Sequence, residues 1–381
     1  MSNKKNILLV ANWDSDVGYA WWLMENFWCT IAQEYSNKGY ACFLIYPSIS
    51  IIPKTILESP IQIIQHDYED QTKANLNLLK KIIHEQNIGY VYLSDKPEIS
   101  LVYLKLKCWG VKKIAIHDHT PGDRETVSGL KYIAKKCLKI LPLITADLYI
   151  AVTEFVRDRM INSGCLPTNK CCVAKNGIQP IKLAQNMEYY CHDEFGLAHD
   201  STIIISTGRA CYYKQVDFLI LSFAKLCNDH RKDNVFFIFC GDGSELEEFK
   251  YLAIANNVQD KFIFAGQRND ISKLLQSCDI GIQSSKGEVG YSLSILEYMS
   301  AGLATLVPSR PSTCQSIIDN KSGLIFKYDS IESAVEKLLL VVNNEKLRSA
   351  LGENARKSVE NNFNLDNTNK SLLECLSRII N

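Results

Sequence analysis

Apolar runs alternate with helical periodicity along the first half of the chain. Strands are predicted at six apolar runs, residues 6–10, 41–46, 89–93, 113–116, 148–152 and 172–174. Residues 21–35 and 76–86 instead carry apolar positions at the spacing of an amphipathic helix. Because continuous apolar runs separated by helices are typical of strands buried on both faces, this half predicts a parallel sheet covered by helices on both sides.

The second half of the chain repeats this pattern. Strands are predicted at residues 202–206, 235–240, 262–264, 280–282, 304–307 and 324–326, and helices at 216–227, 245–256 and 271–276. Between the halves, residues 180–201 are rich in Asn, Asp, Gly and His and show weak periodicity, which indicates a domain boundary. Residues 367–379 form one further amphipathic helix after both sheets are complete.

These patterns predict an α/β fold of two doubly wound, Rossmann-like domains that face a central cleft. The N-terminal domain is expected to cover residues 1–180 and the C-terminal domain residues 181–365. Residues 366–381 are expected to form a helix that packs back toward the N-terminal domain. Ligands of such sheets bind at the carboxyl ends of the strands, so the loops that follow the strands are where chemistry is expected.

Composition narrows the class of protein. The 381 residues contain 42 Lys and Arg against 42 Asp and Glu, so the net basic charge of a nucleic-acid-binding protein is missing. The 14 cysteines are scattered without a C-x-x-C pair, which favours reduced, mostly buried thiols in a cytoplasmic protein over a disulfide framework or a zinc site. No apolar run reaches the ~18 residues that a membrane-spanning helix needs. We therefore expect no transmembrane segment, no metal and no nucleic-acid partner.

Residues 278–306 carry the most informative local pattern. An apolar strand is followed by a loop with Gly287 and Gly290, and a helix that begins near Tyr291 and carries Glu297. The N–H groups and the dipole at such a helix start favour an anion. A carboxylate one to two turns later can accept hydrogen bonds from a vicinal diol. An anion beside a diol suggests a sugar nucleotide, although an ordinary βα unit would show the same pattern.

Four motifs in the second half resemble retaining glycosyltransferases of the GT-B fold, family 4 (glycosyl transferases group 1). In chain order they are STGRACYYKQVDFLILSF, CGDGSELEEFKYLA, FAGQRNDISKLLQSCDIGIQSS and GYSLSILEYMSAGLATLVPS. The resemblance covers most of the C-terminal domain and weakens in the first. It implies an enzyme that binds a nucleoside-diphosphate sugar, a UDP- or GDP-sugar, in the C-terminal domain and an acceptor in the N-terminal domain. It also implies transfer to a hydroxyl with retention, without a metal or another cofactor.

Two cations in the first motif are the main catalytic candidates. Arg209 and Lys214 leave the end of one strand and can converge on a diphosphate, Arg as a planar fork and Lys as a point charge. Two solvated loop cations would give the same pattern. In the family, the matching pair stabilises the departing nucleoside diphosphate, which is why no Mg²⁺ is required. The Gly241–Asp242–Gly243 turn matches a family turn that lies beside the nucleotide.

The fourth motif departs from the E-x₇-E signature of the family. Glu297 matches the second glutamate, which holds the ribose hydroxyls, whereas Val289 stands where the first belongs and Glu288 comes one residue early. A bulge in the loop would return Glu288 to the place from which the family's first glutamate grips the donor sugar. The donor-binding residues that we predict are Gly18, Gly208, Gly241, Gly243, Gly290, Tyr291, Ser292, Leu293 and Glu297.

The N-terminal domain offers His117 in the segment IHDHTPGDRE. In the family, a histidine at such a position contacts the donor sugar, so His117 joins Arg209, Lys214 and Glu288 as a catalytic candidate. The spacing also permits a metal pair with His119, and a structural histidine at a strand end is a further possibility. Arg124 in the same segment is a candidate second phosphate contact.

Residues 131–140 have the basic amphipathic pattern of a helix that lies on an anionic membrane, although a solvated helix face shows the same pattern. Many family members extend glycans on a polyprenyl-diphosphate lipid, which favours peripheral attachment to the inner face of a bacterial membrane. The function that we infer is sugar transfer in the synthesis of a surface polysaccharide or lipid-linked oligosaccharide. A sugar-nucleotide epimerase of the same architecture, or a non-catalytic donor-binding scaffold subunit, remains open.

Overall fold

The computed structural model describes residues 5–17 and 21–380, which divide into two compact units. The first unit combines residues 1–120, 124–174 and 369–381, and the second combines residues 121–123 and 175–368. The chain therefore changes unit at 174/175, whereas the sequence pattern places the boundary at 180/181. Residues 369–381 belong to the first unit, although they follow the whole of the second sheet in sequence.

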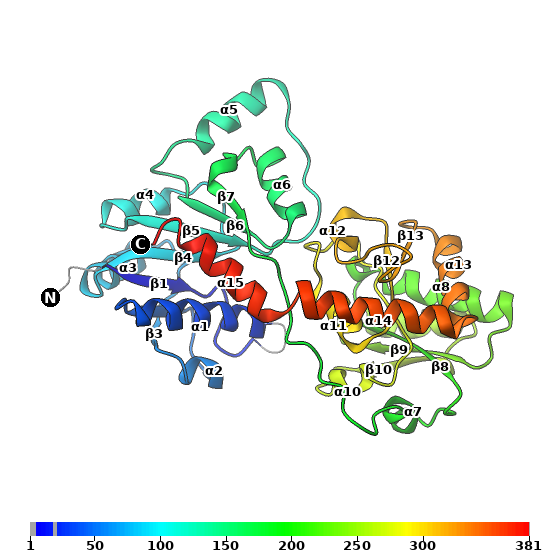
Figure 1. Cartoon of the computed structure of the whole chain (residues 1–381). Coiled ribbons are helices and arrows are strands. Elements are labelled where there is room, and N and C mark those ends of the chain that lie inside the picture. The colour runs from blue at the N-terminus through cyan, green and yellow to red at the C-terminus, as the bar shows by residue number, and fades with distance from the viewer. Residues whose placement is uncertain (1–4, 18–20, 381) are drawn as a thin grey trace. The chain divides into compact units, whose positions relative to one another are not determined.

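The first unit is built on a seven-stranded sheet in which every neighbouring pair is parallel (Figure 1). The strand order is β3-β2-β1-β4-β5-β6-β7. The strands are β1 (Asn6–Val10), β2 (Cys42–Tyr46), β3 (Ile61–Gln65), β4 (Ile88–Ser94), β5 (Lys113–Asp118), β6 (Leu148–Ala151) and β7 (Cys171–Val173). The central strands are mostly apolar because both faces of the sheet are covered, as the runs of buried residues in β1, β2 and β6 show.

Helices connect the strands of this sheet. They are α1 (Trp22–Asn37), α2 (Lys54–Leu57), α3 (Lys73–Glu85), α4 (Leu101–Cys108), α5 (Gly129–Lys139) and α6 (Glu154–Asn162), with the short 3₁₀ turn Thr168–Lys170 before β7. Several helices begin at a hydroxyl residue whose side chain accepts a backbone N–H, as Thr72, Ser100 and Thr153 do. Such caps satisfy donors that the first helical turn leaves without a partner, and so fix where each helix starts.

The second unit repeats the architecture with six parallel strands in the order β10-β9-β8-β11-β12-β13. The strands are β8 (Thr202–Thr207), β9 (Val235–Cys240), β10 (Phe262–Gly266), β11 (Ile280–Ile282), β12 (Ala304–Pro308) and β13 (Leu324–Phe326). The helices and turns are α7 (Tyr190–Phe195), the 3₁₀ turn Tyr212–Lys214, α8 (Val216–His230), α9 (Leu246–Ala255), α10 (Ile271–Leu275), α11 (Leu293–Ala301), α12 (Pro311–Cys314), α13 (Ile331–Val342) and α14 (Glu345–Asn362). The last helix, α15 (Leu365–Leu376), carries the chain back into the first unit.

The prediction of two doubly wound parallel sheets is confirmed. In the second unit the core clusters beneath β8, β9 and β11, where aromatic rings pack in pairs such as Phe237 and Phe262, whose centroids lie 4.4 Å apart. A parallel sheet that is buried on both faces leaves its carboxyl edge as the place where loops can carry polar groups.

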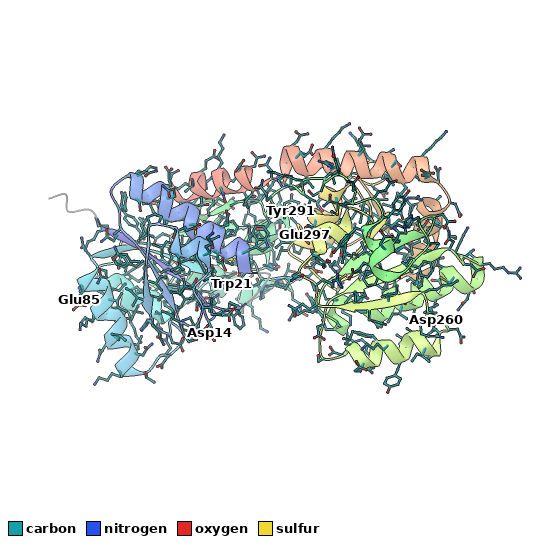
Figure 2. All side chains as sticks on the ribbon, turned by 90° about the horizontal axis from the view of Figure 1, so that it is seen from below. Asp14, Trp21, Glu85, Asp260, Tyr291 and Glu297 are labelled. Carbon is teal, nitrogen blue, oxygen red and sulfur yellow. The ribbon has the colours of Figure 1, made fainter. Side chains whose placement is uncertain are left out.

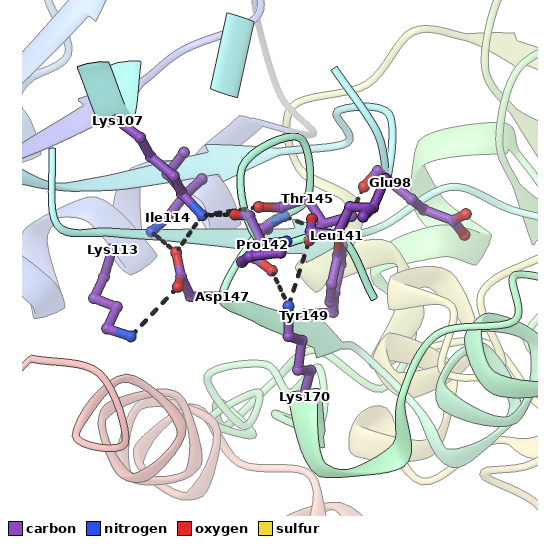
Figure 3. Close-up of polar contacts among 11 residues, drawn as sticks. Glu98, Lys107, Lys113, Ile114, Leu141, Pro142, Thr145, Asp147, Tyr149 and Lys170 are labelled. Carbon is purple, nitrogen blue, oxygen red and sulfur yellow. Dashed lines mark hydrogen bonds and ion pairs between the residues drawn. The ribbon is translucent and has the colours of Figure 1, made fainter. Parts of the chain in front are cut away.

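A polar network fixes the segment that leads into β6 (Figure 3). The Asp147 carboxylate pairs with Lys107 at 3.2 Å and accepts the Ile114 N–H at 3.0 Å. The Tyr149 hydroxyl donates to the Glu98 carbonyl at 2.8 Å and accepts the Ala146 N–H at 3.0 Å. These bonds tie the chain before β6 to α4, to the start of β5 and to the loop after β4, so they fix where β6 enters the first sheet.

Candidate functional site

Two glycine loops lie against one another where β8 and β9 end. A Cβ on Gly241 would lie 1.7 Å from the Gly208 carbonyl oxygen, and a Cβ on Gly243 would lie 2.3 Å from that of Ala210. The backbones are also joined by hydrogen bonds from Gly208 N to Cys240 O at 3.0 Å and from Ala210 N to Asp242 O at 2.9 Å. The glycines of this turn are therefore needed for close backbone packing, which fixes the shape of the loop that carries Arg209.

The structure brings Lys214 and Glu288 together. The Lys214 ammonium forms an ion pair with the Glu288 carboxylate, and both side chains are largely buried, at 19% and 11% exposure. The Lys214 backbone carbonyl accepts the Ser284 hydroxyl at 2.9 Å, which anchors this loop to the segment after β11. Glu288, one residue early in the sequence motif, is thus placed to hold the ammonium of Lys214.

Arg209 lies exposed in the same loop after β8. Its guanidinium makes no hydrogen bond or ion pair with any residue in the described part of the chain. A cation in this state is available to a ligand at the carboxyl edge of the sheet.

Ser292 is the N-cap residue of helix α11, and its side chain caps no N–H group of the first turn. Gly290, two residues earlier, has a left-handed φ of 96° and donates its N–H to the Ser312 carbonyl at 2.6 Å. Leu293 is the first helical residue, and Glu297 lies half-buried one turn later (Figure 2 shows it with Tyr291). The uncapped first turn supplies N–H donors and the positive end of the helix dipole.

Tyr298 is a residue of this site that the sequence patterns do not reveal. Its buried hydroxyl accepts the Thr207 N–H at 2.6 Å and lies 2.9 Å from Thr207 Oγ1, and its ring fills the space beside Gly281. Burial raises the pKa of the Tyr298 hydroxyl, so it stays protonated. In the sequence, Tyr298 looks like any residue on the apolar face of a helix. In the structure, its hydroxyl joins α11 to Thr207, the last residue of β8.

Replacing Tyr298 with Phe is expected to destabilise the second unit by about 1–3 kcal/mol, because the Thr207 N–H and hydroxyl lose a buried partner. Urea unfolding followed by circular dichroism measures the change. Tyr251→Phe is the matched control because that side chain is 71% exposed. Equal midpoints for the two variants would show that the Tyr298 hydroxyl does not stabilise the fold.

His117 is fully buried in the first unit, at the carboxyl end of β5. The Tyr92 hydroxyl lies 2.6 Å from His117 Nδ1, and the rings of Phe27 and His119 pack on it with centroids 4.9 and 4.1 Å away. Burial, and secondarily the neighbouring His119, lower the pKa of His117 well below 6.5. The imidazole is therefore neutral in the folded protein at neutral pH.

This depressed pKa predicts a pH-dependent stability. Below pH 6.5 the unfolded chain protonates His117 while the folded chain does not, so the free energy of unfolding is expected to decrease as pH falls, by at most about 1.4 kcal/mol per pH unit. The stability that comes from keeping His117 neutral is fully present above pH 6.5 and is lost as pH falls toward the depressed pKa of the folded protein. Urea unfolding of wild type and of His117→Asn, which retains an acceptor for Tyr92, measures it. If the free energy of unfolding changes equally with pH in both proteins from pH 7.5 to 5.5, the prediction is wrong.

The remaining predicted residues have varied surroundings. Gly18 lies outside the described residues. Arg124 is exposed in the first unit and donates to the Thr120 hydroxyl at 3.0 Å. His119 packs beside His117, but across the described ranges no group of three His, Cys, Asp or Glu side chains gathers in a way that could hold a metal ion.

Comparison with protein families matches residues 191–358 to the model for glycosyl transferases group 1. An uncharacterized glycosyltransferase of Methanocaldococcus jannaschii is 29% identical over 68% of this chain and 65% of its own length. The Escherichia coli enzyme UDP-Gal:α-D-GlcNAc-diphosphoundecaprenol α-1,3-galactosyltransferase is 25% identical over 62% of this chain and 59% of its own. Both matches therefore span less than two-thirds of these relatives.

Among solved structures, Anabaena HepE in complex with UDP-glucose superposes with a TM-score of 0.77 at 16% identity, over 99% of this chain and 100% of that one. The likeness at this identity establishes a shared fold. With the family match, it confirms the resemblance that the four motifs carry. Residues 191–358, which lie within the second unit, are thus similar to glycosyl transferases group 1.

Proposed function

We propose that this protein is a glycosyltransferase that moves a sugar from a nucleoside-diphosphate sugar to a hydroxyl acceptor with retention of configuration. The observation that carries the proposal is the arrangement at the carboxyl edge of the second sheet. There, the exposed Arg209, the ammonium of Lys214 and the uncapped start of α11 come from loops that are fastened to one another. Glu297 follows one turn into α11. A nucleoside diphosphate needs positive charge for its phosphates and, beside it, a carboxylate that accepts hydrogen bonds from its ribose diol.

The residues have distinct roles in the proposed reaction. Arg209 and Lys214 stabilise the negative charge that develops on the departing diphosphate, and the N–H groups of α11 add to this field. The ion pair with Glu288 orients the Lys214 ammonium. Glu297 accepts hydrogen bonds from the ribose hydroxyls. With charge supplied by side chains and a helix start, we propose that transfer proceeds without a metal.

The similar proteins support the choice of substrates. Anabaena HepE was solved with UDP-glucose, and the Escherichia coli relative transfers galactose from a UDP-sugar to a diphosphoundecaprenol-linked sugar. For this chain we propose a UDP- or GDP-sugar donor and a growing polysaccharide or lipid-linked oligosaccharide as acceptor.

A thermal-shift experiment without metal tests donor binding directly. UDP, GDP and their sugars are added to wild type and to Glu297→Ala. A ligand at 100 times its Kd stabilises the folded state by about 2.7 kcal/mol, which raises the melting temperature measurably. We expect one nucleotide to raise the melting temperature of wild type and to raise that of Glu297→Ala much less. If no nucleotide shifts the transition, the proposed donor site is wrong.

We further propose peripheral attachment to an anionic membrane through α5. Apolar side chains stand exposed on α5 and just after it, with Leu130 at 84%, Ile133 at 57% and Ile140 at 59%, and Lys131 and Lys136 are exposed beside them. Apolar side chains flanked by lysines suit a helix that lies in the interface of an anionic bilayer. Within the described ranges, the helices are too short or too polar to cross a membrane.

The paired substitution Leu130→Ser/Ile133→Ser is expected to weaken binding to vesicles that contain phosphatidylglycerol by at least about tenfold, because two exposed apolar side chains no longer enter the bilayer. Co-sedimentation measures the bound fraction. The control, Ile51→Ser/Leu57→Ser, removes side chains that are 67% and 63% exposed elsewhere on the first unit. Similar losses in both variants would exclude α5 as the attachment surface.

A further inference from the structure

A polar cavity of about 550 Å³ lies within the first unit, at the carboxyl ends of β4 and β5. Asp95 directly follows β4, Asp118 ends β5, and α5 and α6 contribute further lining residues. Its volume falls in the range of small-molecule sites, about 300–1,000 Å³. Parallel sheets bind ligands at this edge, so both position and size are those of a ligand site. It is distinct from the donor site proposed in the second unit.

Three cations from two helices line this cavity. Lys135 and Lys139 are four residues apart on α5 and share one face of it, and Arg159 comes from α6. Lys139 is only 4% exposed and Arg159 only 6%. Burial of charged groups is unfavourable unless they are paired, so a cavity lined by them needs compensating groups in the protein or in a ligand.

Two of these cations are held in place by carboxylates. Arg159 Nη2 donates to Asp118 Oδ2 at 2.9 Å and to Thr120 Oγ1 at 3.0 Å. The Lys139 ammonium pairs with Glu98, whose backbone carbonyl is fixed by Tyr149 (Figure 3). These two cations are therefore positioned before any ligand arrives.

Glycine at position 164 leaves room for the Glu98 carboxylate of this pair and for the Met160 carbonyl. A Cβ there would lie 2.6 Å from Glu98 Oε1 and 2.3 Å from the Met160 carbonyl oxygen. A larger residue would displace the carboxylate that holds the buried ammonium.

The other cations of the cavity lack a carboxylate partner within it. The Lys135 ammonium donates to the Ser163 carbonyl at 2.6 Å, and Arg124 donates to the Thr120 hydroxyl. Among the residues described, neither has a carboxylate within ion-pair distance. Lys96 pairs with Glu69, which is outside the lining. Of the remaining acids, Asp95 accepts the His119 N–H, and Glu125 is exposed.

We propose that this cavity binds the phosphate group of an acidic ligand and, resting on the proposed function, that this ligand is the acceptor. The fork of Arg159 and the point charges of Lys135 and Lys139 together match the several oxygens of a phosphate. The exposed carboxylates of Asp95 and Glu125 suit the hydroxyl groups of an attached sugar. The ligand class is a phosphorylated sugar, free or carried on a lipid.

Calorimetric titration with inorganic pyrophosphate tests the site in the full-length chain saturated with UDP, so that a donor site is already occupied. Lys135→Gln removes the charge but keeps a donor for the Ser163 carbonyl. Lys136→Gln makes the same change at an exposed residue outside the lining. We expect Lys135→Gln to weaken pyrophosphate binding at least about tenfold and Lys136→Gln to leave it within about twofold. Arg124→Gln is a second variant at an exposed position, with an expected loss in the same direction.

Competition then identifies the source of the phosphate. Displacement of pyrophosphate by glucose 1-phosphate indicates a free sugar phosphate, and displacement by dihexanoyl phosphatidic acid indicates a lipid. Equal affinities in the Lys135→Gln and Lys136→Gln variants, or no pyrophosphate binding, would overturn the proposed site. Displacement by neither competitor would overturn its assignment to the acceptor. Failure of UDP to bind would instead overturn the donor proposal, and the pyrophosphate titration would still report on this cavity.

Discussion

The substitution Lys214→Ala is expected to lower kcat for sugar transfer by about a hundredfold to a thousandfold. The ammonium lies at the carboxyl edge of the second sheet and is oriented by Glu288. Removal of a positioned group that stabilises developing negative charge typically has an effect of this size. Steady-state kinetics with the donor that the thermal-shift experiment identifies would measure it.

The neighbouring Lys286 provides the control for this experiment. Lys286→Ala makes the same change of charge in the loop before α11, at an exposed side chain with no assigned role. We expect its kcat to stay close to that of wild type. Because Lys214→Ala also leaves Glu288 without its partner, melting temperatures of both variants are needed. A folded Lys214→Ala protein with wild-type kcat would remove Lys214 from the mechanism.

Substitution of Gly241 with Ala is expected to destabilise the second unit by about 3 kcal/mol or more. The new methyl group would lie 1.7 Å from the Gly208 carbonyl oxygen, and backbone of two adjacent strands would have to separate. Overpacking against atoms that cannot rotate away is costly. The melting temperature is expected to fall by roughly 6–12 °C, at 2–4 °C per kcal/mol for a domain of this size.

Gly196→Ala separates this clash from simple backbone strain. Gly196 has a left-handed φ of 65°, and a Cβ there would meet no atom within 4 Å. The Gly196→Ala variant should lose only about 1–2 kcal/mol of unfolding free energy, which is the cost of placing an L-residue in this conformation. If both variants melt at the same temperature, the loops after β8 and β9 do not require close packing.

Apolar runs were sufficient to predict most strands, because a strand buried on both faces is apolar throughout. Strand β9 begins and ends at its predicted residues, Val235 and Cys240. Strand β3 (Ile61–Gln65) was missed because it is an edge strand whose glutamines are exposed, so its pattern is mixed. Helices α4 and α6 were missed as well, since short helices with few buried positions give weak periodicity.

The sequence predicts the functional sites less completely than it predicts the fold. Motifs placed Arg209, Lys214 and Glu297 in loops and helices of the expected kind, but no pattern could indicate that Glu288 holds the Lys214 ammonium. The cavity of the first unit was not predicted, because its lining comes from four separate segments of the chain. Only the fold brings Glu98, Lys139 and Gly164 together.

The order in which the first unit is completed has a consequence for synthesis on the ribosome. Residues 369–381 belong to that unit and include the buried Leu372 and Leu376, and Cys375 Sγ donates to the Val173 carbonyl at 3.6 Å. They are translated only after residues 175–368, which takes roughly 10–40 s at about 5–20 residues per second. During that interval the nascent first unit exposes the apolar surface that α15 later covers. A chaperone that binds apolar surface could bind the first unit during this interval. The second unit can fold before the first unit is complete.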